Sequence, residues 1–200
     1  MSDQIFNTDY WETRWKNGQT GWDIGYASPP IIEYFKTVAN KNARILIPGC
    51  GNAWEGEALL NMGFKNVYLL DISSSALKCF QERVKHFPEN QIINDDFFEL
   101  NDSFDFIVEQ TFFCALPPSL RPNYAENAHR LLTENGKLIG VLFDTVFDFD
   151  HPPFGGNAEE YRSYFEPFFD ILHLERAYNS IEPRQGNELF IEARKKTKTY

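Results

Sequence analysis

The chain has 200 residues, a length that suits a single domain with one substantial hydrophobic core. Its 29 acidic and 19 basic side chains give a net charge of −10, which argues against nucleic acid or an anionic membrane surface as the main partner. The sequence has no apolar run long enough for a transmembrane helix and no signal-peptide pattern at its start. Three widely spaced cysteines without a Cys-x-x-Cys pair predict free thiols, so we expect a cytoplasmic protein.

The first forty residues carry two helical segments ahead of any strand, at 9–15 and 30–39. Short β-rich runs then alternate with helical stretches, a pattern typical of an α/β fold with a parallel sheet. The expected strands in this part are 43–47, 67–70, 92–93, 104–108 and 137–143. The expected helices are 54–62, one that begins within 73–75 and continues to about Val84, and 122–132.

The C-terminal part follows a different pattern. A long loop rich in Asp, Pro and Gly covers residues 144–157, and a helix is expected at 158–165. Two last strands, at 170–176 and 188–194, are expected to pair antiparallel at one edge of the sheet. The order of the expected strands and helices predicts one domain over residues 1–200, with a Rossmann-like α/β fold. Its seven-stranded sheet is mostly parallel with an antiparallel C-terminal edge, and helices cover both faces.

A Gly-Cys-Gly turn at residues 49–51 joins the first expected strand to the helix after it. Glycines there let the chain turn sharply and let a ligand approach the backbone. Asp71 ends the second strand about 20 residues later, where a carboxylate can accept both hydroxyls of a ribose. Asp95 or Asp96 ends the third strand at the same edge. These strand ends predict a site for an adenosine-containing ligand; the alternative is that they are only turn residues.

Sites of this plan serve NAD and S-adenosylmethionine alike. Trp54 stands where the dinucleotide fingerprint needs its third glycine, which counts against binding of a pyrophosphate. The chain is also too short for a separate substrate domain and has no Tyr-x-x-x-Lys pair. Five strands followed by a helix and two edge strands match the seven-stranded methyltransferase plan instead. We therefore expect S-adenosylmethionine as the cofactor.

The N-terminal residues 10–23, YWETRWKNGQTGWD, resemble a motif of the thiopurine S-methyltransferase superfamily. The closer likeness is to the plant and microbial thiol and halide methyltransferases. Further matching stretches are IPGCG at 47–51, FFCAL at 112–116, Arg-Pro at 121–122 and Pro-Pro-Phe at 152–154. The likeness extends over about residues 10–195 and implies a class I S-adenosylmethionine-dependent methyltransferase.

The resemblance also implies roles for single residues. Three tryptophans would line the cofactor near its methionine end, Gly49 would contact it through the backbone, Asp71 would hold the ribose, and an Asp-Phe pair would flank the adenine. The expected cofactor-binding residues are Trp11, Trp15, Trp22, Gly49, Gly51, Asp71, Asp96, Phe97 and Gln110. Gln110 stands where thiopurine enzymes have Arg and some halide enzymes have Tyr, so its role and the substrate stay open.

The tryptophans have a physical interpretation of their own. Trp11 and Trp15 are four residues apart and share one helix face, and Trp22 follows a turn that contains glycine. Such a stripe can simply cover the core, but three tryptophans ahead of the first strand favour an aromatic lid within residues 1–40. Aromatic faces attract cations such as a sulfonium by about 0.5–2 kcal/mol. Closure of a lid would also remove water from an anionic nucleophile.

The expected reaction is an in-line displacement in which a small soft nucleophile attacks the methyl group. A thiolate, bisulfide, halide or thiopurine anion needs no strong general base, so no catalytic residue is named and positioning is the main contribution. The expected pocket walls are Trp11, Trp22, Phe112, Phe113 and Phe154, with core packing as the alternative for the three Phe. Glu109, at the end of the fourth strand, is expected to be structural, although it could orient Gln110.

Other residue clusters and other classes of function are less well supported by the sequence. Asp144, Asp148, Asp150 and His151 match no standard calcium loop, so we expect a solvated acidic loop and no metal. The expected partner is a small-molecule substrate, with neither nucleic acid nor membrane, and the expected state is a monomer. The alternatives are a methyltransferase that acts on a macromolecule, a cofactor-binding protein without catalysis and, more distantly, an NAD dehydrogenase.

Overall fold

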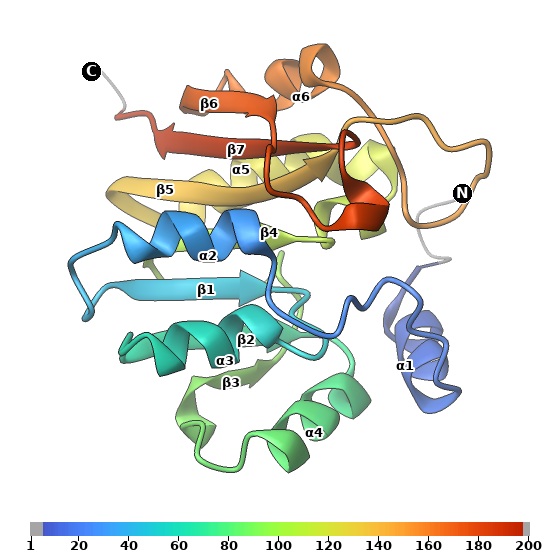
Figure 1. The fold of residues 1–200 in the computed structure, drawn as a ribbon, viewed down its shortest axis with the longest axis vertical. Coiled ribbons are helices and arrows are strands. Elements are labelled where there is room, and N and C mark those ends of the chain that lie inside the picture. The colour runs from blue at the N-terminus through green and yellow to red at the C-terminus, as the bar shows by residue number, and fades with distance from the viewer. Residues whose placement is uncertain (1–5, 198–200) are drawn as a thin grey trace.

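A seven-stranded sheet with the order β3-β2-β1-β4-β5-β7-β6 forms the centre of the molecule (Figure 1). The computed structural model of the protein describes residues 6–197. Strands β1 to β5 are parallel, whereas β7 is antiparallel to both of its neighbours. The predicted fold class is confirmed. The strands are β1 (Arg44–Pro48), β2 (Asn66–Asp71), β3 (Ile92–Asn94), β4 (Phe104–Gln110), β5 (Leu132–Phe143), β6 (Phe169–Arg176) and β7 (Glu188–Lys195).

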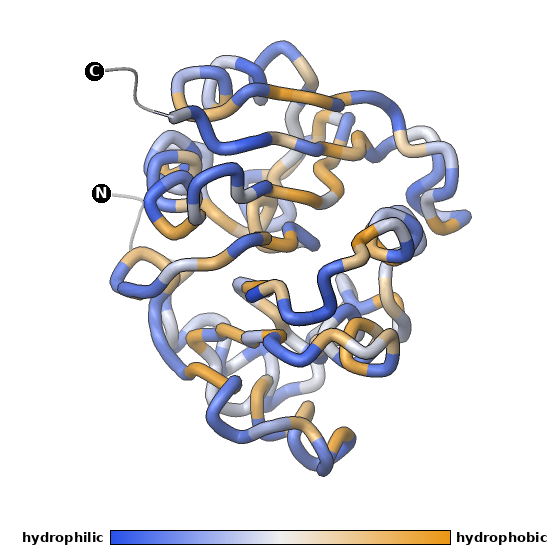
Figure 2. Tube along the Cα trace, turned by 90° about the vertical axis from the view of Figure 1, so that its left-hand side faces the viewer, coloured by the Kyte–Doolittle hydropathy of each residue, from blue (hydrophilic) through white to orange (hydrophobic). Residues whose placement is uncertain are grey.

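Helices cover both faces of this sheet, which explains why the central strands are apolar almost throughout. Ile31, Phe35 and Leu59 lie in a buried cluster on one face, together with helix residues from α4. Tyr124 and Phe165 lie in the cluster on the other face. Hydrophobic and hydrophilic segments alternate along the chain trace (Figure 2). The helices are α2 (Pro29–Lys36), α3 (Trp54–Asn61) and α4 (Ser74–Arg83) on the first face, and α5 (Arg121–Leu131) and α6 (Ala158–Phe165) on the second.

Helix α1 (Thr8–Lys16) lies outside these layers, at the edge of the sheet toward which β1 and β5 point (Figure 1). It begins at Asn7, whose side chain accepts a hydrogen bond from the Tyr10 N–H at 3.1 Å. None of its residues is buried, so α1 is not part of the hydrophobic core. Four short 3-10 helices complete the connections: η1 (Glu89–Gln91), η2 (Phe113–Ala115), η3 (Pro118–Leu120) and η4 (Glu182–Arg184).

One strand boundary in the C-terminal half differs from the sequence-based prediction, and the structure also gives the order of the last two strands, which the sequence left open. Strand β5 begins at Leu132, directly after α5, instead of at residue 137. Asn135 has the left-handed backbone (φ 61°) in this stretch, a conformation that asparagine tolerates better than most residues. The last two strands pair antiparallel at one edge of the sheet, as expected. Strand β7 lies between β5 and β6 and is buried along most of its length, whereas in the edge strand β6 only Phe169 and Leu174 are buried.

The strand order reverses at β1. From β1 the chain proceeds outward through β2 and β3, and then returns to place β4 and β5 on the other side of β1. The loops after β1 and β4 consequently leave in opposite directions and open a crevice at the carboxyl ends of the strands. Among residues 6–197, no helix is long and apolar enough to cross a membrane.

Candidate active site

A cavity of about 740 Å³ lies at the carboxyl ends of the parallel strands, within the usual size range of small-molecule sites. Its walls come from α1 and the loop after it, the turns after β1, β2 and β3, the loops after β4 and β5, and the β6–β7 connection. The predicted site residues that line it are Trp11, Trp15, Trp22, Gly49, Gly51, Asp71, Asp96, Phe97 and Phe112.

The glycine turn after β1 requires its glycines. Gly49 and Gly51 have φ values of +56° and +52°, in the left-handed region that other residues avoid. A Cβ on Gly49 would collide with the ring of Phe112, and a Cβ on Gly51 would lie 3.1 Å from Cζ2 of Trp15. The turn is therefore packed directly against an aromatic wall on one side and the α1 segment on the other.

Asp71 joins the end of β2 to this turn. Its carboxylate accepts the Gly51 N–H at 2.9 Å and the Ser73 N–H at 2.8 Å. Burial raises the pKa of Asp71 to about 6, although these two backbone donors favour the charged form. A carboxylate offers about four acceptor positions, so Asp71 can still accept hydroxyl groups from a ligand in the cavity.

The turn after β3 forms a rigid wall. The Asp96 side chain accepts the Phe98 N–H at 2.9 Å, and both acids of this turn, Asp95 and Asp96, line the cavity. Phe97 is only 2% exposed and stacks on Tyr124, with 5.3 Å between ring centroids. Asn127 donates to the Phe97 carbonyl at 2.6 Å. This wall therefore offers a fixed apolar ring beside exposed carboxylates.

The three predicted lid tryptophans pack on one another above the cavity. The Trp22 ring lies edge-on to the rings of Trp11 and Trp15, at centroid distances of 5.5 and 6.1 Å. All three line the cavity, and the helix that carries two of them has no buried residue. The alternative of a stripe that covers the hydrophobic core does not describe this arrangement.

Glu12 fastens α1 to the start of α4, a contact that the sequence did not indicate. Its carboxylate accepts the Ser73 hydroxyl at 2.7 Å, the Ser75 hydroxyl at 2.5 Å and the Ser75 N–H at 3.2 Å, and Lys16 lies 3.3 Å away. The Ser75 hydroxyl is the main reason why the pKa of Glu12 is lowered to about 2. A carboxylate at the N-terminus of a helix is further favoured by the helix dipole.

Asp23 fastens the loop after α1 to the glycine turn. It accepts a hydrogen bond from the Trp54 indole N–H at 2.7 Å and another from the Asn52 side chain. Trp54 thus has a structural use at the position where a dinucleotide site has glycine. On the opposite side, Arg184 of η4 donates to the Trp22 carbonyl at 2.8 Å. Arg184 also lines the cavity, and only its place in the β6–β7 connection could have suggested this.

Three predicted site residues do not line this cavity. Gln110, at the end of β4, is half-buried, and its side-chain oxygen has no hydrogen-bond partner among residues 6–197. Phe113 is 1% exposed and belongs to the core on the α5 face. Phe154 lies one layer behind the cavity, with its ring 5.7 Å from that of Phe6, which does line it.

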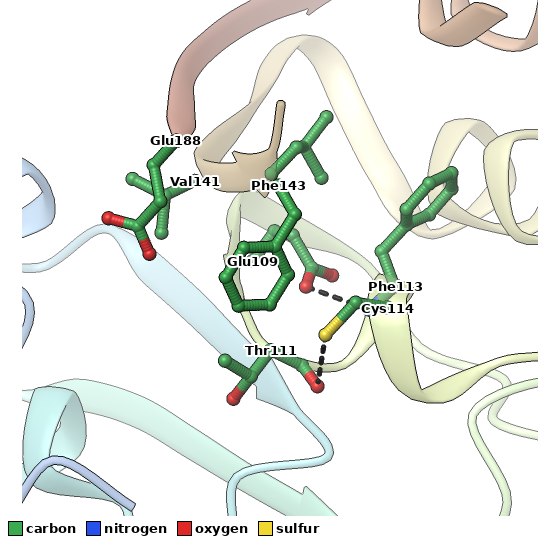
Figure 3. Close-up of a pocket in the computed structure, with 8 residues that line it drawn as sticks. Glu109, Thr111, Phe113, Cys114, Val141, Phe143 and Glu188 are labelled. Carbon is green, nitrogen blue, oxygen red and sulfur yellow. Dashed lines mark hydrogen bonds between the residues drawn. The ribbon is translucent and has the colours of Figure 1, made fainter. Parts of the chain in front are cut away.

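Glu109 shapes the loop after β4 from a fully buried position. One carboxylate oxygen accepts the N–H groups of Phe112 and Phe113 at 2.9 and 2.8 Å, and the other accepts the Tyr124 hydroxyl at 2.7 Å. Burial raises its pKa to about 7. The expected structural role is present, and no contact with Gln110 accompanies these three. Glu109 also borders a second, much smaller cavity, drawn in Figure 3.

The residues present fit an adenosine-containing cofactor. The two left-handed glycines leave room for close approach to the backbone, and Asp71, Asp96 and Phe97 meet at the same end of the cavity. Within residues 6–197 there is no group of three His, Cys, Asp or Glu side chains that could hold a metal ion. The three cysteines are free thiols.

Comparisons with known proteins show the family of the chain. Residues 6–199 match the family model described as Thiopurine S-methyltransferase. The "Probable thiol methyltransferase 2" of Arabidopsis thaliana is 32% identical over 184 residues, which cover 89% of this chain and 81% of that protein. The "Thiocyanate methyltransferase 1" of Brassica oleracea is 31% identical over the same length and with the same coverage.

A solved structure shows the same fold. The 1,6-didemethyltoxoflavin-N1-methyltransferase of Burkholderia thailandensis, crystallised with 1,6-didemethyltoxoflavin and S-adenosylhomocysteine, superposes with a TM-score of 0.78. The superposition covers 95% of this chain and 87% of that protein, at 16% sequence identity. Similarity at this level of identity bears on the fold alone.

Proposed function

The chain belongs to the thiopurine S-methyltransferase family, and from this premise we propose that it methylates a small soft nucleophile. It is a methyltransferase that depends on S-adenosylmethionine, the compound that supplies an electrophilic methyl group on a sulfonium sulfur. The acceptor proposed is a thiol, bisulfide, a halide, thiocyanate or a thiopurine. One observation carries this proposal: the cavity of about 740 Å³ brings the glycine turn, Asp71 and the lid tryptophans together at one place.

The adenosine end of the cavity is proposed to lie between the turns after β1, β2 and β3. Asp71 would accept the ribose hydroxyls, Phe97 would pack against the adenine, and Asp96 would lie beside it. The fixed backbone of Gly49 and Gly51 would allow the cofactor to approach closely. This arrangement would point the methionine end of the cofactor toward the three tryptophans.

The nucleophile is proposed to enter on the side of the lid and of the loop after β4. Trp22 and Phe112 line this part of the cavity, as do the two arginines Arg14 and Arg184. Cationic groups in a wall favour an anion, and aromatic rings keep water away from it. The residues of the chain would therefore act by holding the nucleophile in line with the methyl group. Phe113, Phe154 and Gln110 would support this wall from behind.

A substrate panel tests the proposed function. The protein is supplied with S-adenosylmethionine and, separately, with thiols, bisulfide, thiocyanate, iodide and thiopurines, and kcat/KM is measured for each. We expect turnover with at least one of these small nucleophiles. Absence of a methylated product from all of them, or transfer of labelled methyl groups to RNA or protein instead, would contradict the proposal.

We further propose that the protein acts as a monomer in the cytoplasm on a small molecule, without nucleic acid or a membrane as partner. The net charge of −10 and the free thiols support these assignments. The N-terminal lid is proposed to belong to the same single domain, since its anchors Glu12 and Asp23 reach α4 and the glycine turn. Sedimentation of a 23.3 kDa species at micromolar concentration is the expected result.

A further inference from the structure

A second cavity adjoins the large one and shares three lining residues with it; its lining is drawn in Figure 3. Its volume is about 10 Å³, which is enough for one water molecule. Thr111, Cys114 and Phe143 line both cavities, so the two cavities adjoin each other. The side chains of Glu109 and Glu188 also line the small cavity.

Glu109 has one acceptor position left for a water molecule in this cavity. A carboxylate has about four acceptor positions, two on each oxygen. Oε1 accepts two N–H groups and Oε2 accepts one hydroxyl, as described above. The remaining position lies on Oε2, and Glu109 lines the cavity. A buried water needs two to four polar partners, and Glu109, Glu188 and the Thr111 hydroxyl can supply them.

We propose that Glu109 accepts the proton of a thiol substrate through one water molecule held in this small cavity. The inference rests on the proposed function, because it concerns the acceptor that the enzyme methylates. The thiol S–H bond breaks and its electron pair stays on sulfur. The proton passes to the hydroxyl of Thr111, which lines both cavities, as that hydroxyl gives its own proton to the water. The water in turn gives one proton to Glu109, which becomes a neutral carboxylic acid. The thiolate then forms a bond to the methyl carbon as the bond from that carbon to the sulfonium sulfur breaks. Glu109 afterwards returns the proton to solvent.

The groups around Glu109 suit it to this task at neutral pH. Burial is the main reason why the pKa of Glu109 is raised to about 7. At neutral pH both its charged and its neutral form are therefore populated, which suits a group that takes up and releases a proton. Burial raises the pKa of Tyr124 from α5 well above its usual value and that of Cys114 from η2 to about 12, so both remain protonated. Glu188 from β7 is paired with Arg184 at 3.3 Å. The lining residues from β5 are Val141, Leu142 and Phe143, which do not titrate.

Substrates with and without a proton separate this role from a structural one. A thiol has a proton to lose, whereas thiocyanate and iodide are anions at every working pH. Glu109→Gln keeps a carbonyl oxygen for the two N–H groups of the loop but cannot take up a proton. We expect it to lower kcat/KM for an alkyl thiol at pH 7 by roughly a hundredfold or more, the usual contribution of a positioned proton acceptor. The values for thiocyanate and iodide should fall much less than the value for the thiol, because these anions have no proton to lose.

Glu192→Gln is the matched control. Glu192 is another buried carboxylate in the same sheet, on β7, but it contacts Tyr34 and Lys137 and lines neither cavity. Its replacement should leave the ratio of thiol to thiocyanate activity unchanged.

The pH dependence of this ratio is a further test. In the unaltered enzyme, the ratio of thiol to thiocyanate activity should rise between pH 5.5 and 8.5 with an apparent pKa near 7. Any effect of pH on cofactor binding cancels in the ratio.

Tyr124→Phe provides a second test that does not alter Glu109 itself. The substitution removes the hydroxyl that donates to Glu109 at 2.7 Å, so the charged form is less stable and the pKa of Glu109 rises. The midpoint of the activity ratio should move to higher pH. The protonated Glu109 carboxyl group has an infrared C=O band, which is assigned by its loss in Glu109→Gln. In the unaltered enzyme and in Tyr124→Phe alike, the pH midpoint of this band should equal the pH midpoint of the activity ratio measured for that protein.

The outcomes distinguish the two proposals. Equal losses for thiol and thiocyanate in Glu109→Gln, or an infrared midpoint that does not follow the activity ratio, would overturn the role of Glu109 and leave the proposed function standing. Methylation of thiocyanate but of no thiol by the unaltered enzyme would likewise overturn the role of Glu109 and leave the proposed function standing. Inactivity of the unaltered enzyme toward every small nucleophile would overturn the proposed function, and this inference with it.

Discussion

Asp71 and Glu109 are two buried carboxylates at the carboxyl ends of β2 and β4, on either side of β1, and their surroundings give them different tasks. Both are held by backbone N–H groups, and burial raises both pKa values, to about 6 and about 7. Asp71 faces the large cavity, where the charged form can accept hydroxyl groups. Glu109 faces only the small one, next to the wall that it shapes. Their titrations should therefore affect different steps, cofactor binding for Asp71 and acceptor activation for Glu109.

Asp71→Asn should weaken the binding of S-adenosylmethionine by roughly 10- to 100-fold, because hydrogen bonds to a charged group contribute about 1.5–3 kcal/mol. The unaltered protein should also lose affinity as the pH falls through about 6, since protonation removes an acceptor and the negative charge. The variant should lack this pH dependence. Calorimetric titrations between pH 5 and 8 measure both effects, and Asp170→Asn, on the distant strand β6, is the control. An unchanged affinity in Asp71→Asn would refute the ribose assignment.

Gly49→Ala and Gly18→Ala form a matched pair at left-handed positions. Gly18 has φ +64° and nothing within 4 Å of a Cβ, so its replacement carries only the backbone penalty of about 1–2 kcal/mol. At Gly49 the new methyl group would in addition collide with Phe112. We expect Gly49→Ala to lower the free energy of unfolding more than Gly18→Ala does, and to weaken cofactor binding as well. Urea unfolding of both variants measures the difference, and equal losses would contradict the role given to Phe112.

Single residues show where prediction from the sequence stops. The glycines, Asp71 and Phe97 follow strand ends, so the α/β pattern and the family resemblance were enough to place them beside the cavity. Glu12 and Asp23 act through partners that are 61 and 31 residues away in the chain, Ser73 and Trp54. Such contacts depend on how α1 folds back, which no local spacing expresses.

At the scale of elements, α1 is held over the site by polar contacts and contributes no buried residue. Its position thus depends on contacts at the surface of the core, those of Glu12 and of the tryptophan rings among them. The expected boundaries of the helices were close to those observed, because caps and periodic apolar residues are local features. The place of β7 inside the sheet was not foreseen, since two antiparallel strands fit an edge in either order.

Glu12→Gln should loosen this helix. The pKa of Glu12 is lowered from 4.5 to about 2, so the charged contact stabilises the closed arrangement above pH 4.5 and is lost as the pH falls toward 2. At pH 7 we expect amide hydrogen exchange in residues 8–16 to become roughly two- to fivefold faster, as fits a partly exposed charged contact. Glu33→Gln, which alters an exposed pair with Lys36 on α2, should leave this exchange unchanged. Unaltered exchange in Glu12→Gln would mean that other contacts hold α1.

At the scale of the whole molecule, the cavity brings together segments from the N-terminal and the C-terminal half of the chain. The wall residues come from the N-terminal segment, from every turn at the carboxyl edge and from the β6–β7 connection. A ligand that fills this space therefore contacts segments from both ends of the chain at once, and its binding should raise the stability of the entire domain.

S-Adenosylmethionine at about 100 times its Kd should stabilise the protein by about 2.7 kcal/mol. For a domain of this size that corresponds to an increase in Tm of roughly 5–10 °C. S-Adenosylhomocysteine should act in the same direction, whereas NADH should give no shift because the third glycine of a dinucleotide site is replaced by Trp54. Differential scanning fluorimetry compares the three ligands, and a shift with NADH alone would contradict the assigned cofactor.

The antiparallel direction of β7 has a practical consequence for work with this enzyme. Lys195 ends β7 at the opposite edge of the sheet from the cavity, while Phe6 and Asn7 form part of the cavity wall. An affinity tag or surface linker joined at the C-terminus would leave the mouth of the site open. The same addition at the N-terminus would be attached next to the lid, so tag placement alone can change the measured turnover.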